Sequence, residues 1–301
     1  VGKGVNAGAK GMSAKALLDA YYWDNDESEM ASAAANGLLI SNHSYGLVTG
    51  WWEDKTENKW KWLGDTTISS QVDWKYGYYD WQSKDWDEIA FNAPNYLIFK
   101  SAGNDRGSKL PAGVSIHYVF DGSLGDWVES STSRAEVAVN PINAGYSQSS
   151  DVVMSSFSGW GPTDDGRIKP DIVANGVNVF SALSGSDNAY GSYNGTSMAT
   201  PNAAGSALLL QQFYKEKYGV FMRSASLKGL IIHNADEAGN NEGPDYRFGW
   251  GLMNTEKSAV HLLNLDSLSL LKENYLAKND TDEIIVYSDG LSPLKASIVW
   301  T

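Results

Sequence analysis

The sequence predicts an α/β fold with a mostly parallel sheet, because stretches typical of helices and of buried strands alternate along the chain. Residues 28–36 are typical of a helix, with acidic residues at its start and Gly37 just beyond its end. Residues 38–46 then indicate a buried strand that starts with an apolar run and has a polar end. Residues 86–92 and 96–100 repeat this pair, and a long helix of small and apolar residues follows Gly195.

The composition is that of a globular protein and argues against several kinds of partner. The 301 residues, 42% hydrophobic and 20% charged, suit one large domain or one domain with a small second one. A net charge of −13 argues against a nucleic-acid partner, and no apolar run is long enough to span a membrane. The absence of cysteine excludes disulfides and thiolate metal sites.

The first half of the chain contains two ambiguous segments. Residues 14–23 have the propensity of a helix, but their aromatic end favours a strand, and we expect a strand. Residues 47–86 interrupt the alternation and are rich in tryptophan, so we interpret them as an inserted surface hairpin. Their tryptophans either bind peptide or glycan or pack into a small core of their own, and we favour the core.

The second half predicts further elements of both kinds. We expect a loop over 106–132, strands at 135–140 and 177–183, a long helix to about 217, and helices at 226–234 and 255–263. Residues 284–287 and 294–300 are typical of short strands. We therefore divide the chain into a domain over 1–264 and the beginning of a β-domain over 265–301.

The segment Gly195-Thr196-Ser197-Met198-Ala199-Thr200-Pro201 joins a polar loop to the long helix. Ser197 is expected near the helix N-terminus, where backbone N–H groups are unpaired and the helix dipole is positive. Pro201 is expected in the first turn, where its missing N–H costs little. A hydroxyl in this place is either an N-cap or a nucleophile beside a partly formed oxyanion hole.

This heptapeptide is similar to the nucleophile motif of the subtilisin-like serine proteases. Residues 41–46, 101–104 and 157–172 resemble other segments of that family in the same order, and 289–300 resembles the β-sandwich domain of an alkaline-protease branch. The resemblance implies a three-layer α/β/α fold with the site at the carboxyl ends of the strands. It implies Ser197 as nucleophile and Asn104 as oxyanion donor. The substrate would lie between two walls, Ser44-Tyr45-Gly46 and Ser101-Ala102-Gly103.

The family's catalytic Asp strand and its His-Gly-Thr-His helix are not in this sequence, and residues 1–12 resemble the segment just after them. A serine hydroxyl without a base is a weak nucleophile, so we expect an inactive fragment of a serine endopeptidase. The alternative is a catalytically silent peptide-binding or interaction module on the same fold, and a third hypothesis is a carbohydrate-binding protein. His43 is the best-placed substitute base, but we expect it to be a buried wall residue. We expect His117 to be solvated in a loop, and His233 and His261 to be cap or surface residues.

The resemblance also implies a secreted, extracellular bacterial enzyme that acts on protein or peptide and needs no cofactor for its chemistry. Structural calcium is common in the family, and residues 24–27 or 236–245 offer carboxylates, although solvated acidic loops are the favoured interpretation. No metal ligand is assigned. Without the first strand and the His helix the sheet would have an open edge, which we expect an upstream segment or a second copy to cover.

Overall fold

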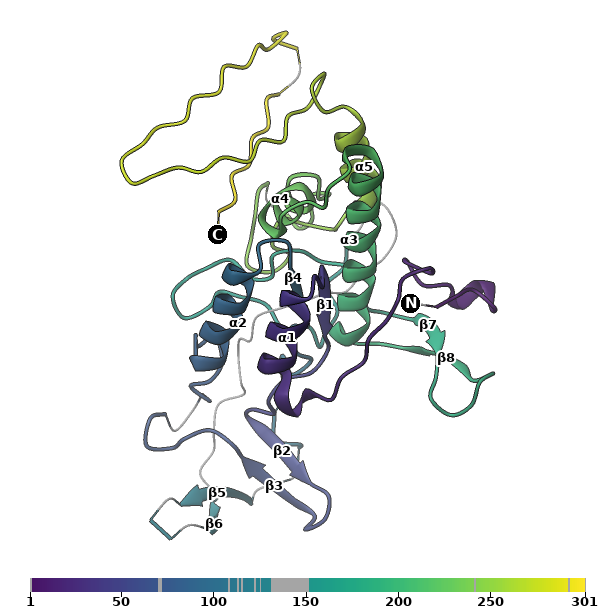
Figure 1. Cartoon of the computed structure of the whole chain (residues 1–301). Coiled ribbons are helices and arrows are strands. Elements are labelled where there is room, and N and C mark those ends of the chain that lie inside the picture. Colours follow the sequence, from purple (N-terminus) through teal and green to yellow (C-terminus); the bar gives the residue numbers. More distant parts are fainter. Residues whose placement is uncertain are drawn as a thin grey trace.

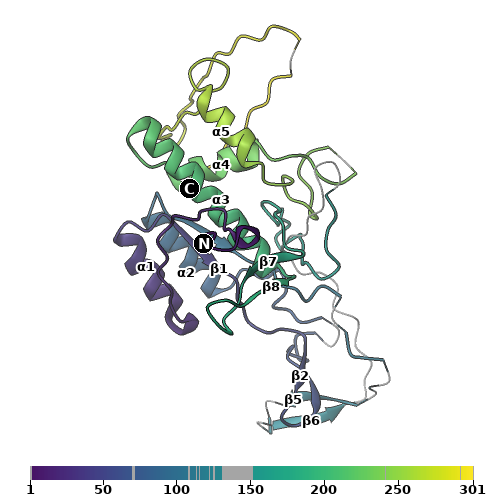
Figure 2. The ribbon, with the colours of Figure 1, turned by 90° about the vertical axis from the view of Figure 1, so that its right-hand side faces the viewer.

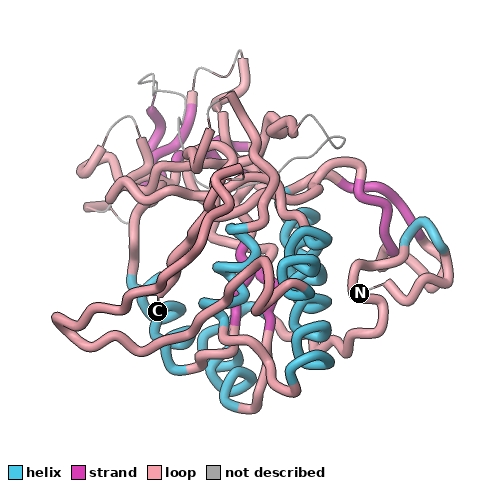
Figure 3. Tube along the Cα trace, turned by 90° about the horizontal axis from the view of Figure 1, so that it is seen from above, coloured by secondary structure: helices cyan, strands magenta, loops and turns pink. Residues whose placement is uncertain are grey.

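The computed structural model describes residues 2–300 except 70–71, 108, 113, 115, 122, 125, 131–151, 241 and 292. At its centre β1 (Ile40–His43) pairs in parallel with β4 (Leu97–Lys100), with His43 opposite Lys100. Helices α1 (Asp26–Ala35) and α2 (Trp81–Asn92) lie on one side of these strands and α3 (Thr196–Tyr218) on the other (Figures 1 and 3). The predicted α/β class and its three layers are confirmed.

An apolar core fills the space between the parallel strands and the helices α3, α4 (Ser224–His233) and α5 (Thr255–Leu263). Leu210, Leu227 and Leu262 are almost completely buried in it, and Ile40 and Leu97 pack against it from the sheet. Side chains of this size each stabilise the fold by roughly 1.5–3 kcal/mol when fully buried. The core therefore holds α3, and with it Ser197, firmly against the ends of β1 and β4.

The tryptophan-rich segment forms a projecting lobe (Figure 2). Strands β2 (Trp51–Asp54) and β3 (Lys59–Trp62) form an antiparallel hairpin, which β5 (His117–Asp121) and β6 (Asp126–Ser130) extend to a four-stranded sheet. Trp51, Trp62 and Tyr76 form a buried cluster. The predicted hairpin and its own small core are thus confirmed, although Trp52 and Trp81 remain exposed.

Two expectations about loops are wrong. The loop expected over 106–132 contains β5 and β6, and His117 is the first residue of β5 rather than part of a loop. The loop expected before Ser197 contains β8 (Tyr190–Tyr193), which pairs with β7 (Val179–Ala182) and so confirms the strand predicted at 177–183. All three missed strands are five residues or fewer and gain their regularity from a neighbouring strand.

The strands predicted at 14–23, 284–287 and 294–300 are wrong. Residues 14–22 form turns and irregular chain, residues 23–25 a 3₁₀ helix, and 284–300 are irregular where described. Leu17, Tyr287 and Trp300 are 97%, 96% and 80% exposed. A strand needs a neighbouring backbone to accept and donate its hydrogen bonds, and no described strand lies along these segments. The strand predicted at 135–140 lies outside the described residues, and the β-domain over 265–301 stays a prediction.

The helix predictions agree with α1, α3, α4 and α5 within two residues at each predicted end. Helix α2 begins five residues earlier than expected, because the Asp80 side chain accepts a hydrogen bond from the Ser83 N–H (2.8 Å) and caps it. None of the helices among the described residues combines the length and the apolar character needed to cross a bilayer.

Candidate active site

Ser197 is the second residue of α3 and is half-buried. The N–H groups on either side of it are engaged, Thr196 N–H with Asn104 Oδ1 (2.9 Å) and Met198 N–H with Gly195 O (3.0 Å). No described residue accepts a hydrogen bond from the Ser197 N–H. This donor, at the positive end of a 23-residue helix, is therefore available to a negatively charged oxygen.

Gly195 turns the chain sharply into α3. Its backbone angles, φ 156° and ψ 157°, belong to a region that is essentially restricted to glycine. Its N–H donates to Gly176 O (2.8 Å), which fixes the turn against the preceding loop. Glycine at this position therefore sets the direction in which the backbone passes from the loop into α3, where Ser197 lies.

Asn104 lies four residues after β4 and reaches the first turn of α3. Its Oδ1 accepts hydrogen bonds from Thr196 N–H (2.9 Å) and Thr196 Oγ1 (3.0 Å). Both donors contact the same oxygen, which fixes the orientation of the amide and leaves the Nδ2 hydrogens without an acceptor among the described residues. The structure thus brings the carboxamide of Asn104 to the residue next to Ser197.

Pro201 is the sixth residue of α3, in its second turn, so its expected place in the first turn is wrong. Because proline has no N–H, the carbonyl of Ser197, four residues earlier, lacks its helical partner. Ser44 Oγ donates to that carbonyl (3.1 Å), and Ser197 Oγ donates to Ser44 O (3.2 Å). The helix irregularity at Pro201 therefore provides the acceptor that ties Ser44 to Ser197, a contact that the sequence analysis missed.

The two predicted walls begin where β1 and β4 end. Ser44, Tyr45 and Gly46 follow β1, whereas Ser101, Ala102 and Gly103 follow β4. Since the strands are parallel neighbours, both tripeptides leave the sheet at the same edge. The Ser101 N–H donates to His43 O (2.9 Å), and Lys100 Nζ donates to Tyr45 O. These bonds hold the two segments side by side.

His43 is buried, 6% exposed, as expected for a wall residue. Its Nδ1 lies 2.6 Å from the Tyr45 hydroxyl, its Nε2 lies 2.7 Å from Ser41 Oγ, and its ring packs on Trp86. Burial, with the nearby Lys100 charge, lowers the pKa of His43 to about 4. Because both ring nitrogens are engaged away from Ser197, His43 is not placed to act as its base. No described Asp, Glu or His side chain is hydrogen-bonded to Ser197 Oγ.

The lowered pKa of His43 makes a pH-dependent contribution to stability. Between pH 6.5 and 4 only the unfolded chain takes up a proton at this residue, so the free energy of unfolding falls as the pH falls. Over this whole pH range, His43 lowers the free energy of unfolding by about 3 kcal/mol. Urea unfolding of wild type and His43→Asn across this range measures it, and we expect the variant to lack this part of the pH dependence. Equal pH slopes in the two proteins would contradict the assignment.

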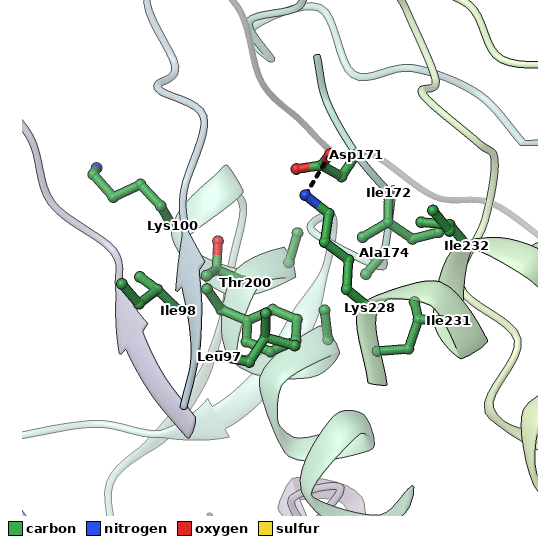
Figure 4. A pocket seen from close by; sticks show the side chains of 13 residues that line it. Leu97, Ile98, Lys100, Asp171, Ile172, Ala174, Thr200, Lys228, Ile231 and Ile232 are labelled. Atoms are coloured by element: carbon green, nitrogen blue, oxygen red, sulfur yellow. Dashed lines mark ion pairs between the residues drawn. The ribbon is translucent and has the colours of Figure 1, made fainter. Parts of the chain in front are cut away.

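A separate cavity of about 130 Å³ lies beside β4, between α3 and α4 (Figure 4). It is lined mainly by apolar side chains, and the Lys228 ammonium pairs with Asp171 Oδ1 at 3.0 Å. Burial opposes the ionised carboxylate, but Lys169 and Lys228 lower the pKa of Asp171 to about 2. Both carboxylate oxygens are therefore paired with cations, and none of the predicted site residues lines this cavity.

The acidic segments considered for calcium make protein contacts. Asp26 accepts a hydrogen bond from Tyr45, and Asp236 pairs with Lys257 and accepts from Asn254. Within the described ranges, no three side chains of His, Cys, Asp or Glu are grouped closely enough to hold a metal ion. Among the described residues, the structure thus adds no location for the structural calcium considered from the sequence.

The chain matches a sequence model of the subtilase family over residues 1–251. It is 38% identical over 86 residues to a C5a peptidase of Streptococcus pyogenes serotype M3, covering 29% of this chain and 7% of that protein. It is 22% identical over 335 residues to the serine protease/ABC transporter B family protein tagA of Dictyostelium discoideum, covering 95% of this chain and 18% of that protein. The chain thus spans a small part of these curated relatives.

Among solved structures, the prenylagaramide maturation protease PagA is similar, with 19% identity and a TM-score of 0.49, covering 82% of this chain and 71% of that one. A lanthipeptide protease matches with 19% identity and a TM-score of 0.48, covering 79% of this chain and 66% of that one.

Proposed function

Because this chain belongs to the subtilase family, we propose that it forms the core of a serine endopeptidase in which Ser197 attacks the substrate carbonyl. The observation that carries the proposal is the hydrogen bond from Thr196 N–H to Asn104 Oδ1, which supports a shared site for Asn104 and the first turn of α3. The substrates are proteins or peptides, in keeping with the peptidase family.

In the proposed reaction, Ser197 Oγ forms a bond to the carbonyl carbon while its proton passes to a histidine base. Negative charge then grows on the carbonyl oxygen. The Ser197 N–H and the Asn104 Nδ2 donors stabilise it, and one such donor is worth about 3–4 kcal/mol of barrier. An extended peptide hydrogen-bonds along the two walls 44–46 and 101–103, as a strand added to a sheet.

We propose that the base and its aspartate come from a segment outside residues 1–301, which also pairs with the outer edge of β1. Within the described chain β1 pairs with β4 alone, so its other edge offers unpaired backbone groups. A second copy of the chain is the other candidate for covering this edge. Size-exclusion chromatography with light scattering distinguishes a dimer from a monomer.

Residues 1–301 alone are expected to have no turnover, because no described base contacts Ser197. With a fluorophosphonate, the Ser197 Oγ–P bond forms and fluoride leaves only when a base takes the hydroxyl proton. We expect no adduct by intact mass and no cleavage of casein. Denatured protein gives the background. An adduct on Ser197 in a chain whose mass is confirmed as residues 1–301 would falsify this expectation.

The matched positive control is a fusion in which a subtilase segment carrying the Asp strand and the His-Gly-Thr-His helix precedes Val1. We refer to this protein as the complemented chain. It is expected to form the fluorophosphonate adduct on Ser197. A complemented chain that folds but remains unlabelled would contradict the proposed role of Ser197.

A second candidate function is a catalytically silent peptide-binding module. It is favoured by the two hydrogen bonds that occupy the ring nitrogens of His43, the histidine nearest the walls. The reading frame upstream of Val1 distinguishes the two candidates. It encodes the Asp strand and the His helix if the protein is an enzyme, and it does not encode them if the protein is a binding module. We further propose that the protein acts outside a bacterial cell, which its lack of cysteine permits.

A further inference from the structure

A continuous chain of hydrogen bonds runs through the layer between β1 and α1. The Tyr45 hydroxyl donates to Asp26 Oδ2 (2.8 Å), so its oxygen accepts from His43 Nδ1–H (2.6 Å). A neutral histidine that carries its proton on Nδ1 has an acceptor at Nε2, which takes the hydroxyl hydrogen of Ser41 (2.7 Å). Ser41 Oγ accepts in turn from the Tyr96 hydroxyl (2.6 Å). Every bond points the same way, from Tyr96 to Asp26.

Both ends of this chain of hydrogen bonds, and His43 in its middle, are buried, whereas Ser41 and Tyr45 are half-buried. Asp26, in the first turn of α1, is 6% exposed, and Tyr96, directly before β4, is 1% exposed. Buried polar groups of this kind are costly when they lose a partner, so the geometry of the chain is strongly determined. The aromatic ring of Tyr45 is held separately, by Trp23 at 5.9 Å and His43 at 5.5 Å between ring centroids.

The hydrogen-bond chain includes the residues on both sides of Ser44, the residue that contacts Ser197. His43 and Tyr45 are the two neighbours of Ser44 along the backbone, and both side chains belong to it. Ser44 exchanges two hydrogen bonds with Ser197, one through its hydroxyl and one through its carbonyl. Fixing the side chains on both sides of Ser44 therefore fixes the carbonyl that accepts the Ser197 hydroxyl.

We infer that Asp26, Tyr45 and His43 are positioning residues, which hold Ser44 so that it sets the rotamer of Ser197 for attack. This inference rests on the proposed function. The three side chains do not touch Ser197; they act through Ser44. The hydroxyl of Tyr45 is the link to test, because Tyr45→Phe removes it and keeps the ring. Asp26→Asn retains an oxygen acceptor for the Tyr45 hydroxyl, whereas Asp26→Ala removes it.

The first measurement uses residues 1–301 and needs no catalysis. In ¹⁵N NMR spectra at pH 7, we expect His43 to be neutral with its proton on Nδ1. Tyr45→Phe should shift the amide resonances of Ser44 and Ser197, and Tyr22→Phe, at a tyrosine that is 85% exposed, should not. Unchanged Ser44 and Ser197 resonances in Tyr45→Phe overturn the inference, whatever the protein does with substrate.

The second measurement uses the complemented chain and the rate at which a fluorophosphonate labels Ser197. Small misplacements of a reacting group cost up to about a hundredfold, so we expect Tyr45→Phe and Asp26→Ala to be about tenfold to a hundredfold slower. Asp26→Asn and Tyr22→Phe should label like wild type. Wild-type labelling by Tyr45→Phe overturns the positioning role and leaves the proposed function intact. No labelling of the parent protein, with the NMR shifts present, refutes the proposed function alone.

Discussion

Replacing Ser197 with alanine is expected to lower kcat of the complemented chain for a peptide substrate by about a millionfold, the loss typical of a subtilisin without its nucleophile. The reason is that the remaining groups stabilise charge but form no bond to the carbonyl carbon. The Ser197 side chain makes one described hydrogen bond, to Ser44 O, so its removal should change the fold little. Turnover of a peptide amide, with circular dichroism to check the fold, measures the effect.

A matched control distinguishes the role of Ser197 as nucleophile from the role of Ser44, which belongs to the wall 44–46. Ser44→Ala removes the hydroxyl that donates to the Ser197 carbonyl but keeps the backbone carbonyl that accepts from Ser197. Its loss of activity should be far smaller than that of Ser197→Ala. Comparable losses in the two variants, or activity that survives in Ser197→Ala, would show that Ser197 is not the attacking group.

Replacing Asn104 with alanine is expected to lower kcat of the complemented chain by about a hundredfold to a thousandfold and to change KM little. This is the loss typical of removing one oxyanion donor from a subtilisin, and it arises because the donor acts on charge that develops only in the transition state. Steady-state kinetics with a peptide amide provides both constants.

Asn104 also has a structural contact, which needs its own controls. Asn104→Asp keeps an oxygen for Thr196 N–H and Oγ1 but loses the Nδ2 donor, so it should be as impaired as Asn104→Ala. Thr196→Val removes only the hydroxyl hydrogen bond and should remain close to wild type. If Thr196→Val is as impaired as Asn104→Ala, the Asn104 side chain acts by supporting α3 and not as an oxyanion donor.

The sequence predicted best those elements whose regularity is local. Residues 255–263 carry their own N-cap, Asn254, and α5 has these bounds. Strands depend on partners that the local sequence does not reveal. Residues 14–23 and 284–287 have strand-like composition but no described neighbour, whereas β5 and β6 are regular because they pair with each other and β5 also pairs with β3.

For the candidate site, the heptapeptide at 195–201 indicated Ser197 as the candidate nucleophile, and the family resemblance pointed to Asn104; both assignments stay predictions. The contact between Ser44 and Ser197 was not predicted, because Pro201 was assigned to the wrong turn. A proline four residues after the serine was the available signal, since it leaves the Ser197 carbonyl without a helical donor. The bonding of His43 to Ser41 and Tyr45 depends on side-chain directions in β1 that sequence patterns do not determine.

The most direct test of the account is the structure of the complemented chain with a peptidyl phosphonate bound covalently to Ser197. We expect one phosphonyl oxygen to lie about 2.7–3.1 Å from both the Ser197 N–H nitrogen and Asn104 Nδ2. A phosphonyl oxygen that contacts the backbone nitrogen while Asn104 Nδ2 points away from it would contradict the shared oxyanion site.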